Sequence, residues 1–211
     1  METLRLYDFL PSGNGYKIRL LLTQISMPFE RIEVNILKGE SRTSEFLSKN
    51  PNGKIPVLEI ADGKYLAESN AILMYLSEGT EFLPYDRFLR AKVLQWLFFE
   101  QYSHEPFIAT SRYWISILGK ADEYKEKLQE KHQRGYEALQ VMENHLTNNN
   151  FLVGKSYTIA DIALFAYTHV ADEGGFDLSK FKAIQAWMER IKAQPRFIGI
   201  DYIDEEWGNN S

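Results

Sequence analysis

The spacing of apolar residues along the chain changes near residue 79. Before it, apolar runs are short and alternate with polar turns, while after it apolar residues recur at helical spacing over long stretches. Short runs rich in β-branched and aromatic residues indicate strands, and helical spacing indicates amphipathic helices. The sequence therefore predicts an α/β domain at 1–79 followed by an all-helical domain at 88–211, a fold of the α/β plus all-α class.

The first domain is predicted to hold strand, helix, strand, helix, strand, strand and helix in that order. The two adjacent strands form a hairpin, because the turn at Asp62-Gly63 tolerates positive φ. The last helix starts at Ser69 and closes at Gly79, a residue type common just past a helix end. The other predicted ranges are 4–9, 15–25, 29–36, 44–48, 57–60 and 64–66.

The second domain is predicted to consist of helices that follow a linker at 80–87. Helical patterns cover 88–118 and 124–146, and the second carries one continuous apolar stripe. Another helix starts at Thr158, an N-cap residue with Asp161 three positions later, which is close to a capping box. A further helix at 180–193 stops before Pro195, because proline cannot continue a helix.

The composition is that of a globular protein. Of the 211 residues, 45% are apolar and 14% aromatic, which is ample for a sizeable core. A net charge of −5 without long like-charge blocks argues against a protein that mainly coats nucleic acid or an anionic membrane. The N-terminus lacks a signal-peptide pattern and no apolar run reaches about 18 residues, so we expect a soluble, cytoplasmic protein without a membrane partner.

The chain contains no cysteine, which limits its chemistry. Any thiol reaction has to use a thiol that a ligand brings in, and disulfide frameworks and thiolate metal sites are excluded. The histidines are far apart and show no metal-binding spacing, so we expect no metal site; they are His104, His132, His145 and His169.

The stretch "SGNGYKI" places Ser12 and Asn14 at the start of a helix. Unpaired backbone N–H groups and the helix dipole favour an anion there, and the two side chains add a hydroxyl and an amide donor. The simpler alternative is that one of these residues only caps the helix.

Two further stretches carry candidate binding groups. In "NGKIPVL" a cis bond between Ile55 and Pro56 would turn the Ile55 N–H and C=O outward to pair with a peptide-like ligand, although a trans bond is much commoner. In "AESNAILMYL" Ser69 is a natural N-cap, or it binds a ligand carboxylate while Glu68 pairs with an ammonium group.

These stretches, in this order and followed by a helical half, resemble the cytosolic glutathione transferases over nearly the whole chain. The resemblance implies a thioredoxin-like N-terminal domain and glutathione as co-substrate. It implies that Glu68 and Ser69 hold the γ-glutamyl end and that Ile55 pairs with the cysteinyl backbone before a cis Pro56. Lys54 is expected to meet the glycine carboxylate, with Lys38 and Arg42 as alternatives.

The resemblance also suggests how the thiol is activated. In the serine-type branch a hydroxyl after the first strand donates to the thiolate, and Ser12 falls at that place. A bacterial branch carries a Thr-Pro-Asn-Gly turn there, which makes Asn14 a second catalytic donor. The tyrosine-type mechanism fits poorly, because Asp8 and not Tyr7 aligns with the tyrosine, and the cysteine-type mechanism is excluded.

We therefore expect a homodimeric glutathione transferase that conjugates glutathione to small electrophiles in detoxification. The electrophile is expected between the loop Leu10-Pro11 and the first long helix, which offers Tyr102 and Arg112. Trp207 in the polar tail either folds over the site or is disordered. The alternatives are a glutathione-dependent disulfide reductase or peroxidase, and a non-catalytic module of the same fold.

Overall fold

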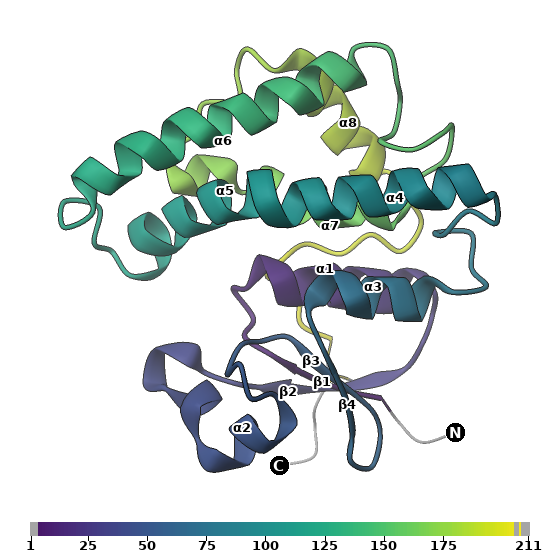
Figure 1. The fold of residues 1–211 in the computed structure, drawn as a ribbon, viewed down its shortest axis with the longest axis vertical. Helices are drawn as coiled ribbons and strands as arrows, with labels where there is room; N and C mark the ends of the chain where they lie inside the picture. Colours follow the sequence, from purple (N-terminus) through teal and green to yellow (C-terminus); the bar gives the residue numbers. More distant parts are fainter. Residues whose placement is uncertain (1–3, 205–206, 208–211) are drawn as a thin grey trace. The chain divides into compact units, whose positions relative to one another are not determined.

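The computed structural model describes residues 4–204 and Trp207. The chain divides into two compact units (Figure 1): unit 1 comprises Met1–Glu78 with Pro195–Ser211, and unit 2 comprises Gly79–Gln194. The tail after Pro195 differs from the expectation that it belongs to the helical domain, because a polar tail without periodicity does not indicate where it packs. In the structure this tail returns to unit 1.

Unit 1 has the predicted order of strands and helices. Two short 3-10 turns, Ile36–Lys38 and Glu40–Arg42, are added between the second strand and the second helix. The elements are β1 (Leu4–Asp8), α1 (Gly13–Gln24), β2 (Phe29–Glu33), α2 (Ser44–Lys49), β3 (Val57–Ala61), β4 (Lys64–Ala67) and α3 (Ser69–Ser77).

The four strands form one mixed sheet in the order β2-β1-β3-β4. β1 runs parallel to β2 and antiparallel to β3, and β3 and β4 form the predicted hairpin. Because side chains alternate between the faces of a strand, the paired Leu6 and Leu58 face one side, and the paired Tyr7 and Val57 face the other. Phe46 of α2 packs on the Val57 side, and Figure 1 shows α1 and α3 side by side on the opposite face.

The returning tail packs on α1 and on the start of β2. The Tyr16 hydroxyl donates to the carbonyl of Ile198 at 2.7 Å, and the ring of Trp207 lies 5.0 Å from that of Phe29. Phe29 is paired with Leu4 at the beginning of β1, whereas the loop before α1 follows the end of that strand. Trp207 therefore packs at the far end of β1 from this loop and does not fold over it.

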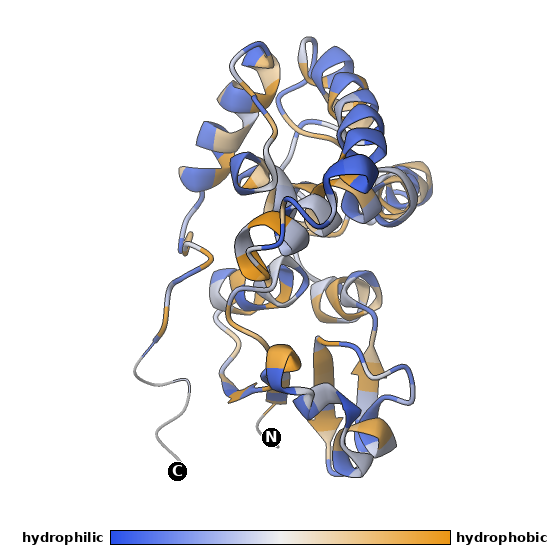
Figure 2. Ribbon diagram, turned by 90° about the vertical axis from the view of Figure 1, so that its left-hand side faces the viewer, coloured by the Kyte–Doolittle hydropathy of each residue, from blue (hydrophilic) through white to orange (hydrophobic). Residues whose placement is uncertain are grey.

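Unit 2 is helical over its described residues. The predicted helix at 88–118 is one continuous helical stretch: α4 (Arg87–Phe99), a π-helical turn (Glu100–His104), α5 (Glu105–Arg112) and a second π-helical turn (Tyr113–Ile117). α6 (Lys125–Leu146), α7 (Ile159–Thr168) and α8 (Lys182–Lys192) follow. Figure 2 shows α6 as the mostly blue helix at the upper right, so most of its residues outside the apolar stripe are hydrophilic. None of the described helices combines the length and apolarity needed to cross a membrane.

The start of α7 confirms the predicted capping box. The Thr158 side chain accepts from the Ala160 N–H, and the Asp161 carboxylate accepts from the Thr158 N–H at 2.9 Å. Asp161 is fully buried and also accepts from the Leu152 N–H and from the Trp187 indole, both at 2.9 Å. Burial raises the pKa of Asp161 to about 6, and the bonds from Trp187, Leu152 and Thr158 act in the opposite direction. One carboxylate thus joins α7, the preceding loop and α8.

Replacing this carboxylate is expected to destabilise unit 2 strongly. Asp161→Ala leaves the buried donors of Thr158, Leu152 and Trp187 without their acceptor, which should lower the free energy of unfolding by about 3 kcal/mol or more. The control is Asp122→Ala, an exposed carboxylate of unit 2 whose loss should cost at most about 0.5 kcal/mol. Urea unfolding followed by circular dichroism measures both, and equal midpoints for the two variants would refute this role of Asp161.

Candidate functional site

Ser12 caps α1, as the simpler of the two interpretations predicted. Its side chain accepts from the Gly15 N–H at 3.3 Å, and its backbone N–H donates to the carbonyl of Phe9 at 2.7 Å. A hydroxyl that accepts one hydrogen bond still carries a proton to donate. Capping the helix and binding a ligand are therefore compatible for Ser12.

Asn14 is the second residue of α1, and its side chain contacts the start of α3. The Ser69 hydroxyl donates to Asn14 Oδ1 at 3.2 Å, and Lys17 Nζ lies 2.8 Å from the same oxygen. Lys17 Nζ also lies 3.2 Å from Ser69 Oγ. Two of the candidate stretches, 55 positions apart in the sequence at Asn14 and Ser69, are thus joined in the structure.

The expected helix cap at Ser69 is wrong by one residue. The N-cap of α3 is Glu68, with a φ of 68°, and Ser69 is the first residue of the helix. The hydroxyl of Ser69 is used in the contact with Asn14 and does not cap its own helix. A positive φ is uncommon for a residue with a side chain and occurs often at ligand sites. Glu68 is exposed, so its carboxylate is accessible.

A buried ion pair supports the loop before α1. Asp8 at the end of β1 and Arg19 on α1 are both fully buried, with Asp8 Oδ2 2.9 Å from Arg19 Nε. Arg19 also donates through Nη2 to the carbonyl of Leu10 at 2.6 Å and through Nη1 to that of Ile200 at 2.8 Å. Burial raises the pKa of Asp8 to about 6, while Arg19 and Arg31 lower it. One guanidinium therefore fixes the strand end, the loop and the returning tail.

The Ile55–Pro56 bond is cis, as the resemblance implied. The loop before it is closed by Asn50, whose amide donates to the carbonyl of Lys54 at 2.7 Å. Arg42 donates to the carbonyl of Asn52 at 3.1 Å, so its guanidinium lies against this loop. Lys54 is exposed and Ile55 is half-buried. Lys54 and Arg42 therefore both stay candidates for the glycine carboxylate.

The four residues predicted for the electrophile occupy different surroundings. Leu10 and Pro11 are half-buried in the loop that leads to Ser12. Arg112 is buried in unit 2, where its Nε donates to Glu173 at 2.7 Å. Tyr102 is exposed and lines a cavity.

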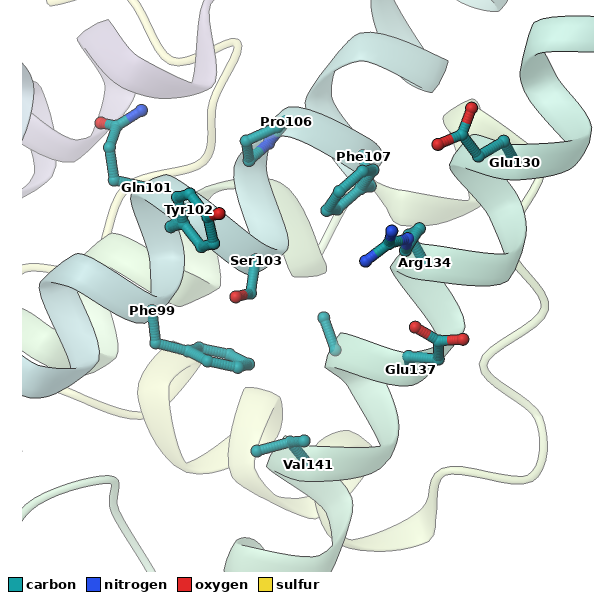
Figure 3. Close-up of a pocket in the computed structure, with 11 residues that line it drawn as sticks. Phe99, Gln101, Tyr102, Ser103, Pro106, Phe107, Glu130, Arg134, Glu137 and Val141 are labelled. Atoms are coloured by element: carbon teal, nitrogen blue, oxygen red, sulfur yellow. The ribbon is translucent and has the colours of Figure 1, made fainter.

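This cavity lies in unit 2 and has a volume of about 530 Å³. Figure 3 shows aromatic side chains of the 99–107 segment on one side and Arg134 and Glu137 of α6 on the other. Arg112 does not line it. The lining residues are Phe99, Gln101, Tyr102, Ser103, Pro106, Phe107, Glu130, Arg134, Glu137, Ala138 and Val141.

Lys17 and Arg19 support the candidate site but are not among the residues predicted from the sequence. Both are long cationic residues in the run "GYKIRLLL", where α1 is otherwise largely apolar and buried. The spacing of Asn14 and Lys17 was a usable signal, because residues three apart lie on the same face of a helix. In the described part of the chain, no group of three or more His, Asp or Glu residues is placed to hold a metal ion.

Comparison with known proteins gives matches along most of the chain. Residues 2–78 match the glutathione S-transferase N-terminal domain, and residues 98–195 match the glutathione S-transferase C-terminal domain. The disulfide-bond oxidoreductase YfcG of Escherichia coli is 35% identical over 195 residues, which is 89% of each chain.

Solved structures agree with these matches. A glutathione S-transferase from Pseudomonas fluorescens superposes with a TM-score of 0.92 at 53% identity, covering 94% of this chain and 99% of that one. A glutathione transferase from Pseudomonas putida, crystallised with one glutathione disulfide per subunit, gives a TM-score of 0.80 at 30% identity, covering 92% and 89%.

The contact between Gly15 and Asp8 gives a test of the loop support. A Cβ at Gly15 would lie 1.5 Å from Asp8 Oδ1, so Gly15→Ala forces the buried ion pair to move. Such overpacking typically costs about 1–3 kcal/mol of unfolding free energy. In the control Gly199→Ala, the new Cβ meets only the end of the exposed Asp201 side chain at 2.9 Å. Urea unfolding of both variants measures the difference, and a Gly15→Ala protein as stable as the control would disprove the tight contact.

Proposed function

This chain belongs to the glutathione S-transferase family, and we propose that it conjugates the thiolate of glutathione to small electrophiles. Family membership supports a glutathione-dependent activity, and relatives have been crystallised with glutathione or its disulfide bound. In the proposed step the thiolate attacks an electrophilic carbon, a carbon–sulfur bond forms, and a leaving group departs with its electron pair or the carbon skeleton takes up a proton. We assign the reaction to detoxification in the cytoplasm, without nucleic-acid or membrane partners.

The observation that carries the proposal is the contact between Asn14 and Ser69, which joins the starts of α1 and α3. Two helix starts with polar side chains favour an anion at one place. A free thiol with a pKa of about 8.5 is only a few per cent ionised at neutral pH, while the thiolate is the nucleophile. Lowering that pKa by about two units requires roughly 2.7 kcal/mol, which one or two charge-assisted hydrogen bonds supply.

The proposed contacts with glutathione are arranged around the joined starts of α1 and α3. Ser12 and Asn14 are the catalytic donors to the sulfur. Ser69, through its backbone N–H at the start of α3, and the exposed Glu68 hold the γ-glutamyl carboxylate and ammonium groups, and Ile55 pairs with the cysteinyl backbone beside Pro56.

The remaining proposed contacts involve the glycine carboxylate of glutathione and the electrophile. Lys54 is the first choice for the glycine carboxylate. Leu10 and Pro11 have the best support for the electrophile, because they precede Ser12 directly, whereas Tyr102 and Arg112 stay predictions.

A second candidate function is reduction of disulfides or peroxides with glutathione. Two observations favour it: the relative from Escherichia coli is named a disulfide-bond oxidoreductase, and the Pseudomonas putida structure holds glutathione disulfide. Without a protein cysteine, every sulfur atom that takes part in a thiol–disulfide exchange comes from a ligand. A substrate panel of aryl halides, isothiocyanates, hydroperoxides and mixed disulfides distinguishes the two activities. Failure to bind a glutathione column would favour the third reading, a non-catalytic module.

The two proposed donors are tested through the pKa of glutathione bound to the protein, followed by the ultraviolet absorbance of the thiolate. A sole donor should change this pKa by about one to two units when it is removed. If Ser12 and Asn14 share the sulfur, Ser12→Ala and Asn14→Ala each raise the pKa by less than the double variant does. Loss of stability in either variant without any change in this pKa would instead show that the residue only supports the helix start.

We also propose that the chain forms a homodimer. In unit 2, Phe88, Phe98 and Tyr102 are 67%, 71% and 85% exposed, and large apolar side chains this accessible often mark a protein contact. Light scattering at micromolar concentration should give about twice the 24.6 kDa of one chain. Phe98→Arg should shift the mass to that of one chain, while the control Leu37→Arg in unit 1 should not. A wild-type mass of one chain would contradict the proposal.

A further inference from the structure

Lys17 is a lysine in an unusual place. Its side chain is fully buried on α1, one turn after Asn14. Its ammonium group contacts Asn14 Oδ1 at 2.8 Å and Ser69 Oγ at 3.2 Å. Burying a lysine is costly because its charge loses hydration. A side chain in such a position therefore calls for a reason beyond packing.

The contact with Lys17 determines which way the Asn14 amide points. An ammonium group has only donors, so it can contact the oxygen of an amide but not its nitrogen. The Ser69 hydroxyl donates to the same oxygen. With the oxygen end held from two sides, the NH₂ end of Asn14 is directed away from Lys17 and Ser69. Rotating the amide by half a turn would break both contacts.

This orientation matters for a bound thiolate. An N–H group that points at sulfur stabilises the negative charge, whereas a carbonyl oxygen in the same place repels it. A side-chain amide held by nothing can present either end. We propose that Lys17 is the positioning residue of the thiol site, which locks the Asn14 amide so that its N–H donates to the glutathione sulfur. This inference rests on the proposed function, because it takes glutathione as the ligand and Asn14 as a donor.

The proposal predicts that Lys17 acts through Asn14. Lys17→Met keeps most of the side-chain volume and removes the hydrogen-bond donors. It should raise the pKa of bound glutathione by about one unit. At a pH well below that pKa, such a shift lowers the fraction of thiolate about tenfold. Because Ser69 still holds the oxygen of Asn14, Asn14→Ala should raise this pKa in the Lys17→Met background too, but by clearly less than in the wild-type protein. The control is Lys64→Met, which removes the same charge from an exposed position on β4 and should leave this pKa unchanged.

Two results would overturn the proposal. In one, Lys17→Met lowers the thermal stability but leaves the pKa of bound glutathione as in the wild type, so that the lysine is only structural. In the other, the effects of Lys17→Met and Asn14→Ala add, so that Lys17 acts on the sulfur independently. If wild-type protein itself does not lower the thiol pKa of glutathione, the proposed function has failed, and this outcome is recognised before any variant is compared.

A second variant keeps the test decisive if Lys17→Met does not fold. Asn14→Asp preserves an oxygen for Lys17 and Ser69 but replaces the NH₂ group with a second oxygen, which would face the sulfur. The proposal predicts that Asn14→Asp raises the pKa of bound glutathione more than Asn14→Ala does, because it adds repulsion to the loss of a donor. An equal or smaller effect of Asn14→Asp would contradict the orientation that we assign to the amide.

Discussion

The ion pair between Asp8 and Arg19 is the contact on which the rest of unit 1 depends. Both side chains are fully buried, and Arg19 connects the end of β1 with the loop at Leu10 and with the returning tail at Ile200. The carboxylate of Asp8 occupies the space where any side chain at Gly15 would lie, which fixes how closely α1 approaches the strand. Such a pair is costly to bury and more costly to break, because removing one partner leaves an uncompensated charge. The start of α1 is therefore held in one position.

The start of α1, held by Asp8 and Arg19, offers a ligand hydrogen-bond donors and no reactive side chain. The chain has no cysteine, so in the proposed reaction the sulfur is the ligand's and the protein contributes the positions of Ser12, Asn14 and Ser69. Donors that are fixed before the ligand binds stabilise a thiolate without reorganising. The buried ammonium of Lys17 contacts the oxygen of the Asn14 amide, and in our proposal this contact fixes the orientation of that amide before the ligand binds. Asp8 and Arg19 hold the backbone, and Lys17 holds the side chain.

Local patterns in the sequence predicted the elements well, because strand alternation, helical spacing and caps act over a few residues. The order of elements in unit 1 and the capping box of Thr158 and Asp161 are confirmed. The features that were missed are contacts between distant residues: Ser69 does not cap α3 because its hydroxyl meets Asn14, and the tail packs on α1 through Ile198 and Ile200. One such contact joins two of the site residues suggested by family resemblance, Asn14 and Ser69.

In the proposed complex, the fixed amide of Asn14 at the start of α1 receives the sulfur of glutathione. The decisive experiment is a crystal structure of the wild-type protein with glutathione. We expect the sulfur within about 3.5 Å of Asn14 Nδ2, with Asn14 Oδ1 still in contact with Lys17 and Ser69. A complex in which the sulfur lies away from this amide, or in which the amide has turned its oxygen toward the ligand, would contradict it.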